Sequence, residues 1–309
     1  MALTATSTVQ LNNGLAMPVI GLGTWRSSGG AVTGGVEHAL KHGYVHIDTA
    51  FNYQNEEEVA AGLGASGVPR ESVFLTEKLW CSFMDKDKVA RGANLMLKKL
   101  GVDYVDQLLI HWPTPIQYAG DTDDDHFPKV CASVRASSAC FEQGKAKSIG
   151  VSNFSVAELE KLLASSKVTP AVNQCESNPY FNNADLREWC KARQIHFVAY
   201  RQSESSLPFR LKDVPSCLRD EVIVNLAKKH GKSPAQVIIR WHLQNGVTVL
   251  PKSVTPSRID ENLNVFDFEL PAEDMAAIDG LGARNFRTCN PRFKPNNELV
   301  FAGDTTVFD

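Results

Sequence analysis

Residues 45–65 read VHIDTAFNYQNEEEVAAGLGA, a short and mainly apolar run followed by a segment in which apolar residues recur with helical spacing. The same plan repeats from residue 19 to about residue 264. The strand candidates are VIGLG (19–23), VHIDT (45–49), VFLTEKL (73–79), VDQLLIHW (105–112), KSIGVS (147–152), AVNQCE (171–176), IHFVAY (195–200) and VTVL (247–250). Short apolar strands separated by helices indicate parallel pairing. Eight such units in about 250 residues predict an α/β fold, a closed (β/α)8 TIM barrel rather than an open doubly wound sheet.

Three stretches lie outside this repeat. Residues 8–18, TVQLNNGLAMP, predict an N-terminal β-hairpin with Asn-Gly at its turn. Residues 201–217 and 281–309 are polar and predict long loops, which in such barrels lie at the C-terminal face and usually bind something. The chain has no linker-like tract, so we expect a single domain over residues 1–309.

Composition narrows the classes of function. With 43% hydrophobic and 22% charged residues, the 309-residue chain can bury a full core. A formal net charge of -3 gives no electrostatic reason to expect nucleic acid or an anionic membrane as a partner. The seven cysteines are scattered without a CxxC pair, and the N-terminus lacks the pattern of a signal peptide. We therefore expect reduced thiols, no metal site and a cytoplasmic protein.

Four polar residues lie at or just beyond the C-terminal ends of the predicted strands: Asp48, Tyr53, Lys78 and His111. Any of them alone is more often structural, as a helix cap or a hydrogen-bonded core residue. Strand ends of this kind, however, are where an α/β barrel places its chemistry. We therefore interpret the four residues together as a catalytic set.

Their chemistry suits the movement of one proton. A free phenol, with a pKa near about 10, is a weak acid at neutral pH. An adjacent ammonium is expected to lower the pKa of Tyr53, and a carboxylate keeps that ammonium charged. Tyr53 would then protonate a carbonyl oxygen as hydride arrives at its carbon, with Lys78 and Asp48 as tuning groups. His111 would orient the oxygen by a hydrogen bond.

Motifs along nearly the whole chain resemble those of the aldo-keto reductase family, including its aldose reductase-like, aldehyde reductase-like and prostaglandin F synthase-like members. The motifs are GLGTW (21–25), GYVHIDTAFNYQNE (43–56), TEKLW (76–80), LLIHWP (108–113), GKAKSIGVSNFS (144–155), VNQCESNP (172–179) and LPKSVTPSRIDENLNVFDFEL (250–270). The resemblance implies a barrel that binds NADPH without a Rossmann fold and reduces aldehydes or ketones. The chain has no GxGxxG after a strand, in agreement.

The resemblance also implies a set of cofactor-binding positions. Near the nicotinamide it places Thr24, Trp25, Asp48, Ser152, Asn153, Gln174 and Tyr200, and around the 2′-phosphate and adenine Lys252, Ser253, Val254, Thr255, Arg258, Glu261 and Asn262. A cation, two hydroxyls and a helix that starts at Pro256 make a plausible anion site on physical grounds alone. The alternative interpretation of Lys252 and Ser253 is a solvated helix cap.

After the seventh strand the chain departs from the family pattern Tyr-Ser-Pro-Leu-Gly. In the family, the backbone and the serine of this segment contact the pyrophosphate. This chain instead has Arg201 and Ser203 there, followed by Glu204. We expect Arg201 and Ser203 to contact phosphate and Glu204 to repel it, so the resemblance leaves the binding mode of this segment open.

Aromatic residues beside the catalytic positions predict a mainly apolar substrate pocket. The predicted lining consists of Trp25, Phe51, Tyr53, Trp80, His111 and Trp112. Each aromatic could equally belong to the core. The acidic run at residues 121–126, DTDDDH, is interpreted as solvated surface rather than as a metal site.

The leading hypothesis is an NADPH-dependent carbonyl reductase, a monomer as such relatives mostly are, acting on a small carbonyl compound. One alternative is a sensor or scaffold protein that binds NADPH with little turnover, which the altered segment after Tyr200 motivates. A metal-dependent barrel hydrolase would need several His and carboxylate ligands at strand ends, where only His111 and Asp48 qualify. The natural substrate and the physiological direction stay open.

Overall fold

Parallel strands form the centre of the molecule in this computed structural model, which describes residues 3–27, 29–114, 127–166, 168–201, 215–287, 292–293 and 299–300. In hydrogen-bonding order they are β3 (Leu22–Gly23), β4 (His46–Asp48), β5 (Phe74–Leu79), β6 (Gln107–Ile110), β7 (Ile149–Ser152), β8 (Val172–Glu176), β9 (His196–Tyr200) and β10 (Thr248–Val249). The Gly21 N–H donates to the Val249 carbonyl over 2.9 Å, and the Gly23 N–H donates to the Pro251 carbonyl over 3.0 Å. The first and last strands therefore meet, and the predicted (β/α)8 barrel is confirmed.

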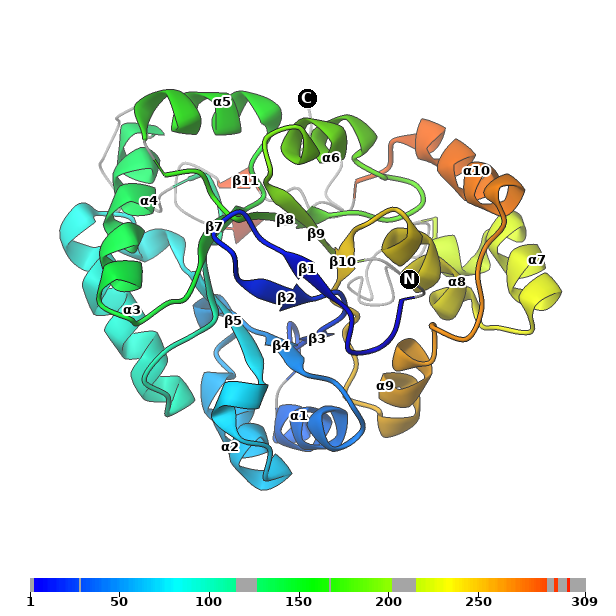
Figure 1. Cartoon of the computed structure of the whole chain (residues 1–309), viewed down its shortest axis with the longest axis horizontal. Helices are drawn as coiled ribbons and strands as arrows, with labels where there is room; N and C mark the ends of the chain where they lie inside the picture. Colours follow the sequence, from blue (N-terminus) through cyan, green and yellow to red (C-terminus); the bar gives the residue numbers. More distant parts are fainter. Residues whose placement is uncertain are drawn as a thin grey trace.

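Helices surround the strands on all sides (Figure 1). They are α1 (Ala31–Lys41), α2 (Glu56–Ser66), α3 (Lys86–Leu100), α4 (Phe127–Glu142), α5 (Val156–Ser165), α6 (Ala184–Lys191), α7 (Glu221–His230), α8 (Pro234–Gln244), α9 (Pro256–Leu263) and α10 (Ala272–Gly280). Ser155 and Ser233 start α5 and α8 with capping boxes, which satisfy amide N–H groups of the first turn. Within the described residues, no helix combines the length and apolar character that crossing a bilayer requires.

The predicted N-terminal hairpin is confirmed and covers one end of the barrel. Strands β1 (Thr8–Gln10) and β2 (Ala16–Pro18) pair antiparallel, and they lie across the ring of strands in Figure 1 (dark blue). The Asn12 side chain donates to the Pro170 carbonyl over 3.1 Å, and the Asn13 side chain donates to the Lys147 carbonyl over 3.0 Å. Both acceptors precede strands, so the hairpin covers the N-terminal end, which we call the floor.

The floor is apolar and tightly packed. Leu11 and Met17 of the hairpin lie in one buried cluster with Phe74 and Leu109 of the strands. Beside Phe74 the imidazole of His46 is fully buried, and burial first, then the charge of Lys78, lowers its pKa to about 3. A Cβ on Gly21 would lie 2.6 Å from Nδ1 of that ring. Only glycine fits at position 21 without displacing the ring.

The described cysteines are buried and free, as expected: Cys81, Cys131, Cys140, Cys175, Cys190 and Cys217. Burial raises the pKa of the Cys81 and Cys140 thiols, that of Cys175 to about 12 and that of Cys190 to about 11. These side chains therefore remain neutral thiols at neutral pH.

Candidate active site

The C-terminal ends of β4, β5 and β6 bring the predicted catalytic residues together. Asp48 is the last residue of β4, Lys78 lies near the end of β5, and His111 directly follows β6. Tyr53 ends a short 3-10 turn, Phe51–Tyr53, that follows β4. Because neighbouring strands are parallel, their C-terminal ends lie at the same end of the barrel, opposite the floor; we call this end the mouth.

Lys78 is the centre of this group. Its Nζ lies 2.5 Å from Asp48 Oδ1, donates to the Thr49 carbonyl over 2.9 Å and lies 3.3 Å from the Tyr53 hydroxyl. The side chain is 1% exposed, so all three contacts are made away from water. Burial alone would lower the pKa of this amine, but Asp48 and Tyr53 together raise it above the usual value. Lys78 therefore carries a fixed positive charge at neutral pH.

At the Tyr53 hydroxyl, Lys78 lowers the pKa as expected, but burial outweighs this effect. Burial raises its pKa, Lys78 partly offsets that effect, and the result is a pKa of about 12 rather than one below the usual value. The phenol is thus fully protonated at neutral pH in the free chain. It holds a proton that it can give to a more basic oxygen, such as one becoming an alkoxide.

The imidazole of His111 lies next to this phenol. The two ring centroids are 5.7 Å apart in an edge-on arrangement, and the ring of Trp80 lies 5.2 Å from His111. Burial first, and then Lys78, holds the pKa of His111 well below its ordinary value. The imidazole is therefore neutral at pH 7 and carries one N–H that can donate a hydrogen bond.

A second group of predicted residues lies beside the first, in strands β7, β8 and β9 or directly after them. Ser152 Oγ donates to the Gln174 carbonyl over 2.7 Å, and the Tyr200 hydroxyl donates to Asn153 Oδ1 over 2.6 Å. The Asn153 amide also donates to the His111 carbonyl over 2.9 Å. These residues form one network that joins the predicted nicotinamide positions to His111.

Two of these cofactor candidates also contact Asp48. The Gln174 amide donates to Asp48 Oδ2 over 2.8 Å, which satisfies the oxygen that Lys78 does not contact. Both the backbone N–H and the hydroxyl of Thr24 donate to the Asp48 carbonyl over 3.1 Å. In the free chain, Gln174 and Thr24 therefore hold Asp48 in place.

The predicted phosphate residues lie at the start of α9. Ser253 is buried and its hydroxyl accepts the Thr255 N–H over 3.1 Å. Lys252 is half-buried, Val254 and Thr255 lie directly before the helix, and Arg258 is exposed in its first turn. Glu261 and Asn262 lie three and four residues after Arg258, about one helical turn later.

The sequence did not identify Arg26 as part of this group. Lys252 Nζ lies 3.4 Å from the Arg26 carbonyl, and burial together with the Arg26 charge lowers the pKa of Lys252. The guanidinium groups of Arg26 and Arg201 lie 4.8 Å and 4.6 Å from the centre of the Trp25 ring. The position of Arg26 in the loop after β3 was the available signal, because barrel closure places that loop beside Lys252.

The aromatic candidates divide into two sets. Trp80 and Trp112 lie against His111, with ring centroids 5.2 Å and 6.3 Å from it. Phe51 instead packs edge-on against Phe83 and under the ammonium of Lys99. Ser203, Glu204 and the acidic run at residues 121–126 lie outside the described residues.

Comparison with known proteins agrees with the barrel that the structure shows. The family model described as "Aldo/keto reductase family" matches residues 19–283. The chain belongs to the aldo/keto reductase family, a class of NADP-dependent oxidoreductases, so the enzyme class and cofactor expected from the motifs are those of its family.

Individual relatives match over almost the full length. The chain is 41% identical over 274 residues to 9,11-endoperoxide prostaglandin H2 reductase of Trypanosoma cruzi, covering 88% of this chain and 90% of the relative. It is 40% identical over 296 residues to glyoxal reductase of Bacillus subtilis, covering 95% and 98%. The crystal structure of a Bombyx mori aldo-keto reductase in complex with NADP is similar with a TM-score of 0.85 and 33% identity, covering 93% and 95%.

Proposed function

We propose that this chain is an NADPH-dependent carbonyl reductase in which Tyr53 donates the proton. The observation that carries the proposal is the position of Lys78 Nζ, which contacts both Asp48 and the Tyr53 hydroxyl at the strand ends beside His111. A half-buried acid held between a fixed cation and a neutral imidazole is suited to protonating an oxygen on which charge develops.

The residues divide the work as follows. NADPH, when bound, supplies the hydride that reduces the carbonyl carbon. The neutral imidazole of His111 donates a hydrogen bond to the carbonyl oxygen and orients it next to Tyr53. The Tyr53 phenol passes its proton to that oxygen, and the adjacent ammonium of Lys78 stabilises the phenolate that remains. Asp48 holds the ammonium in place through its 2.5 Å contact.

The residues at the start of α9 fit the 2′-phosphate that distinguishes NADPH from NADH. Lys252 and Arg26 are two cations held close enough that one lowers the pKa of the other, and an anion between them would relieve that repulsion. The Ser253 and Thr255 hydroxyls and the first N–H groups of α9 add donors. This donor set supports a phosphate rather than a free ribose hydroxyl at this position.

For the substrate, Trp80 and Trp112 beside His111 favour a small aldehyde or ketone with an apolar or flat body. The relatives named for reducing glyoxal and prostaglandin H2 support this broad class. We further propose that the chain acts as a monomer. We also propose that it acts in the cytoplasm, a reducing compartment, which the free buried cysteines among the described residues support.

The test is the rate of NADPH oxidation with 4-nitrobenzaldehyde, measured beside NADH, for the wild type and two tyrosine variants. Tyr53→Phe should lower kcat roughly 10²–10⁴-fold, because the proton donor is lost. Tyr104→Phe is a matched control, since Tyr104 is also half-buried with a lysine, Lys147, 4.1 Å from its ring centre, but lies ahead of β6 at the floor. It should keep wild-type activity.

Full turnover in Tyr53→Phe would remove that residue from the mechanism. NADPH binding without turnover, across a broad panel of aldehydes and ketones, would favour instead the sensor or scaffold role. An equal rate with NADH would overturn the assignment of the phosphate residues.

A further inference from the structure

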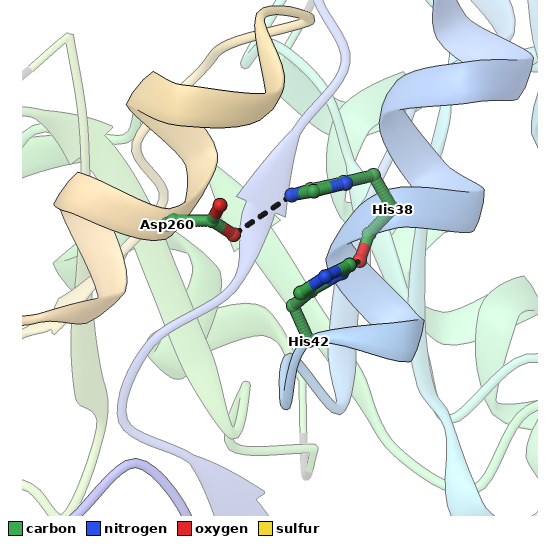
Figure 2. A group of neighbouring side chains, drawn as sticks. All are labelled: His38, His42 and Asp260. Atoms are coloured by element: carbon green, nitrogen blue, oxygen red, sulfur yellow. Dashed lines mark hydrogen bonds and ion pairs between the residues drawn. The ribbon is translucent and has the colours of Figure 1, made fainter.

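Outside the active site, three side chains with metal-binding atoms meet where α1 lies beside α9. Figure 2 shows the imidazoles of His38, on α1, and of His42, directly after α1, one above the other, with Asp260 extending towards them from α9. One ligand atom from each residue can be chosen so that all three lie within 4.8 Å of one another. His38 is partly buried, and His42 and Asp260 are exposed, so an ion can reach them from solvent.

The backbone at the end of α1 orients both imidazoles so that they could bind one ligand. His42 is the C-cap of α1, four residues after His38, so the two side chains lie on the same side, and their rings stack with centroids 3.8 Å apart at 19°. Nδ1 of His42 lies 2.7 Å from the His38 carbonyl. A carbonyl only accepts, so Nδ1 carries the proton, and the lone pair of Nε2 is available to a metal. A backbone hydrogen bond that orients a metal-binding histidine in this way is usual in protein metal sites.

The carboxylate completes a set of ligands. Asp260 Oδ1 lies 2.7 Å from Nε2 of His38, which is the nitrogen that would bind a metal. Tetrahedral Zn²⁺ with bonds near 2.0–2.1 Å needs ligand atoms about 3.3 Å apart. The distances present, from 2.7 Å up to 4.8 Å, lie on both sides of this value. Small rotations of the exposed His42 and Asp260 side chains would therefore suffice.

We propose that His38, His42 and Asp260 form a binding site for a divalent transition-metal ion, Zn²⁺ in the first place, that cross-links α1 to α9. Two imidazole nitrogens and one carboxylate oxygen suit Zn²⁺, Ni²⁺ or Cu²⁺ and do not suit Mg²⁺, which prefers oxygen ligands. Water would occupy the remaining position, as in other sites with three protein ligands.

A second histidine–aspartate pair in the chain, His230 with Asp274, differs because a lysine also contacts its carboxylate. Nε2 of His230 also lies 2.7 Å from an aspartate oxygen, that of Asp274. There the Lys229 ammonium takes the other oxygen over 2.7 Å. A cation already occupies that carboxylate, so this pair is a matched control that should not bind Zn²⁺.

Binding would tie together two helices that already touch. A Cβ on Gly35 of α1 would lie 3.3 Å from Cα of Val254, just ahead of α9, and the Tyr44 hydroxyl donates to the Ile259 carbonyl over 3.3 Å. An ion that binds only the folded chain stabilises it in proportion to the logarithm of its concentration. The melting temperature should therefore rise with added Zn²⁺.

The experiment is calorimetric titration of the tag-free, chelator-treated full chain with zinc chloride, together with thermal unfolding in zinc chloride and, separately, in magnesium chloride. The wild type should bind one Zn²⁺ and melt at a higher temperature with zinc alone. His42→Ala and His38→Ala should weaken Zn²⁺ binding by roughly 100-fold, and Asp260→Asn by roughly 10-fold. His230→Ala should bind like the wild type.

Cobalt(II) provides a spectroscopic readout that is independent of stability. A site of two imidazoles and one carboxylate should give visible ligand-field bands without a thiolate charge-transfer band, whereas binding to a cysteine would give one. The proposal is wrong if the wild type does not bind zinc, if the charge-transfer band appears, or if His42→Ala binds as tightly as the wild type. Carbonyl reduction plays no part in this test, so its outcome is separate from that of the proposed function.

Discussion

The two ends of the barrel bury very different groups. At the mouth, Lys78 and Asp48 lie in the interior as a charged pair, and each makes further contacts to Thr49, Tyr53 or Gln174. At the floor, the hairpin closes an apolar cluster against a neutral histidine. Charge is tolerated inside the barrel only where partners surround it completely. We therefore expect changes at the mouth to remove activity, and changes at the floor to lower stability and leave the chemistry intact.

The largest effect is expected at the mouth, for Lys78→Met. Loss of the ammonium leaves the buried Asp48 without a cation, which should lower the free energy of unfolding by about 3–5 kcal/mol. It also removes the group that stabilises the Tyr53 phenolate, so kcat should fall roughly 10²–10⁴-fold. Thermal unfolding and NADPH oxidation measure the two losses separately.

The double variant Asp48→Asn with Lys78→Met separates the two roles of the pair. With both charges gone, much of the lost stability should return, because no uncompensated charge stays buried. Activity should stay low. Recovery of activity in the double variant would contradict the proposed role of the ammonium.

The next largest effect concerns Glu77, which precedes Lys78 and points from the opposite side of β5, towards the helices. Its side chain is fully buried; one oxygen accepts the Lys78 N–H over 3.0 Å, and the other has no hydrogen-bond partner in the part of the chain that the structure describes. Burial, and then the nearby Glu56, raise its pKa from 4.5 to about 8. On the outer face of β5, the mouth level thus holds a carboxyl group that has no matching cation and stays neutral at pH 7.

This shift makes stability depend on pH. Between about pH 4.5 and about pH 8 the folded chain keeps the Glu77 proton and the unfolded chain releases it, so the free energy of unfolding falls as pH rises. Glu77→Gln cannot ionise, so its stability advantage over the wild type should grow by up to about 4 kcal/mol from pH 5 to pH 9. Urea unfolding at both pH values measures this, with the exposed Glu71→Gln as a control for charge. A gap that does not change with pH would show that Glu77 is not held neutral.

The smallest effect is expected at the floor, for Gly21→Ala. The new methyl group would lie 2.6 Å from His46 Nδ1 and 2.9 Å from Leu250 Cδ2, so the core must shift, at a cost of about 1–3 kcal/mol in the free energy of unfolding. Gly64→Ala, on the exposed face of α2 with no atom within 4 Å, should stabilise the chain by up to about 1 kcal/mol. Both variants should keep wild-type kcat. A large loss of kcat in Gly21→Ala would end the distinction between floor and mouth.

The sequence predicted the barrel well because its local signals are strong. The segments that follow the predicted strands at residues 45–49, 73–79 and 147–152 contain the helices α2, α3 and α5. Gly67 and Gly101 end the first two with positive φ, and Ser155 starts the third with a capping box. These signals depend on near neighbours, which a single sequence shows directly.

The failures involve contacts that only the folded chain makes. Arg26 and Lys252 are far apart in sequence, and barrel closure brings them together. Lys78 lowers the pKa of Tyr53 as the sequence predicted, but the net shift is upward because the sequence does not show the burial that outweighs it. The edge-on contact of Phe51, a proposed pocket residue, with Phe83 is another contact that no motif indicates.

The buried thiols have a consequence for the chemical durability of the protein. Electrophiles such as reactive aldehydes react with thiolates rather than with thiols, because the thiolate is the nucleophile. Burial raises the pKa of the thiols of Cys81, Cys140, Cys175 and Cys190, so few thiolates form. Cys81 directly follows Trp80 at the mouth, and it is 1% exposed. Covalent damage by the compounds that a carbonyl reductase must handle is therefore disfavoured at these positions, by both access and protonation.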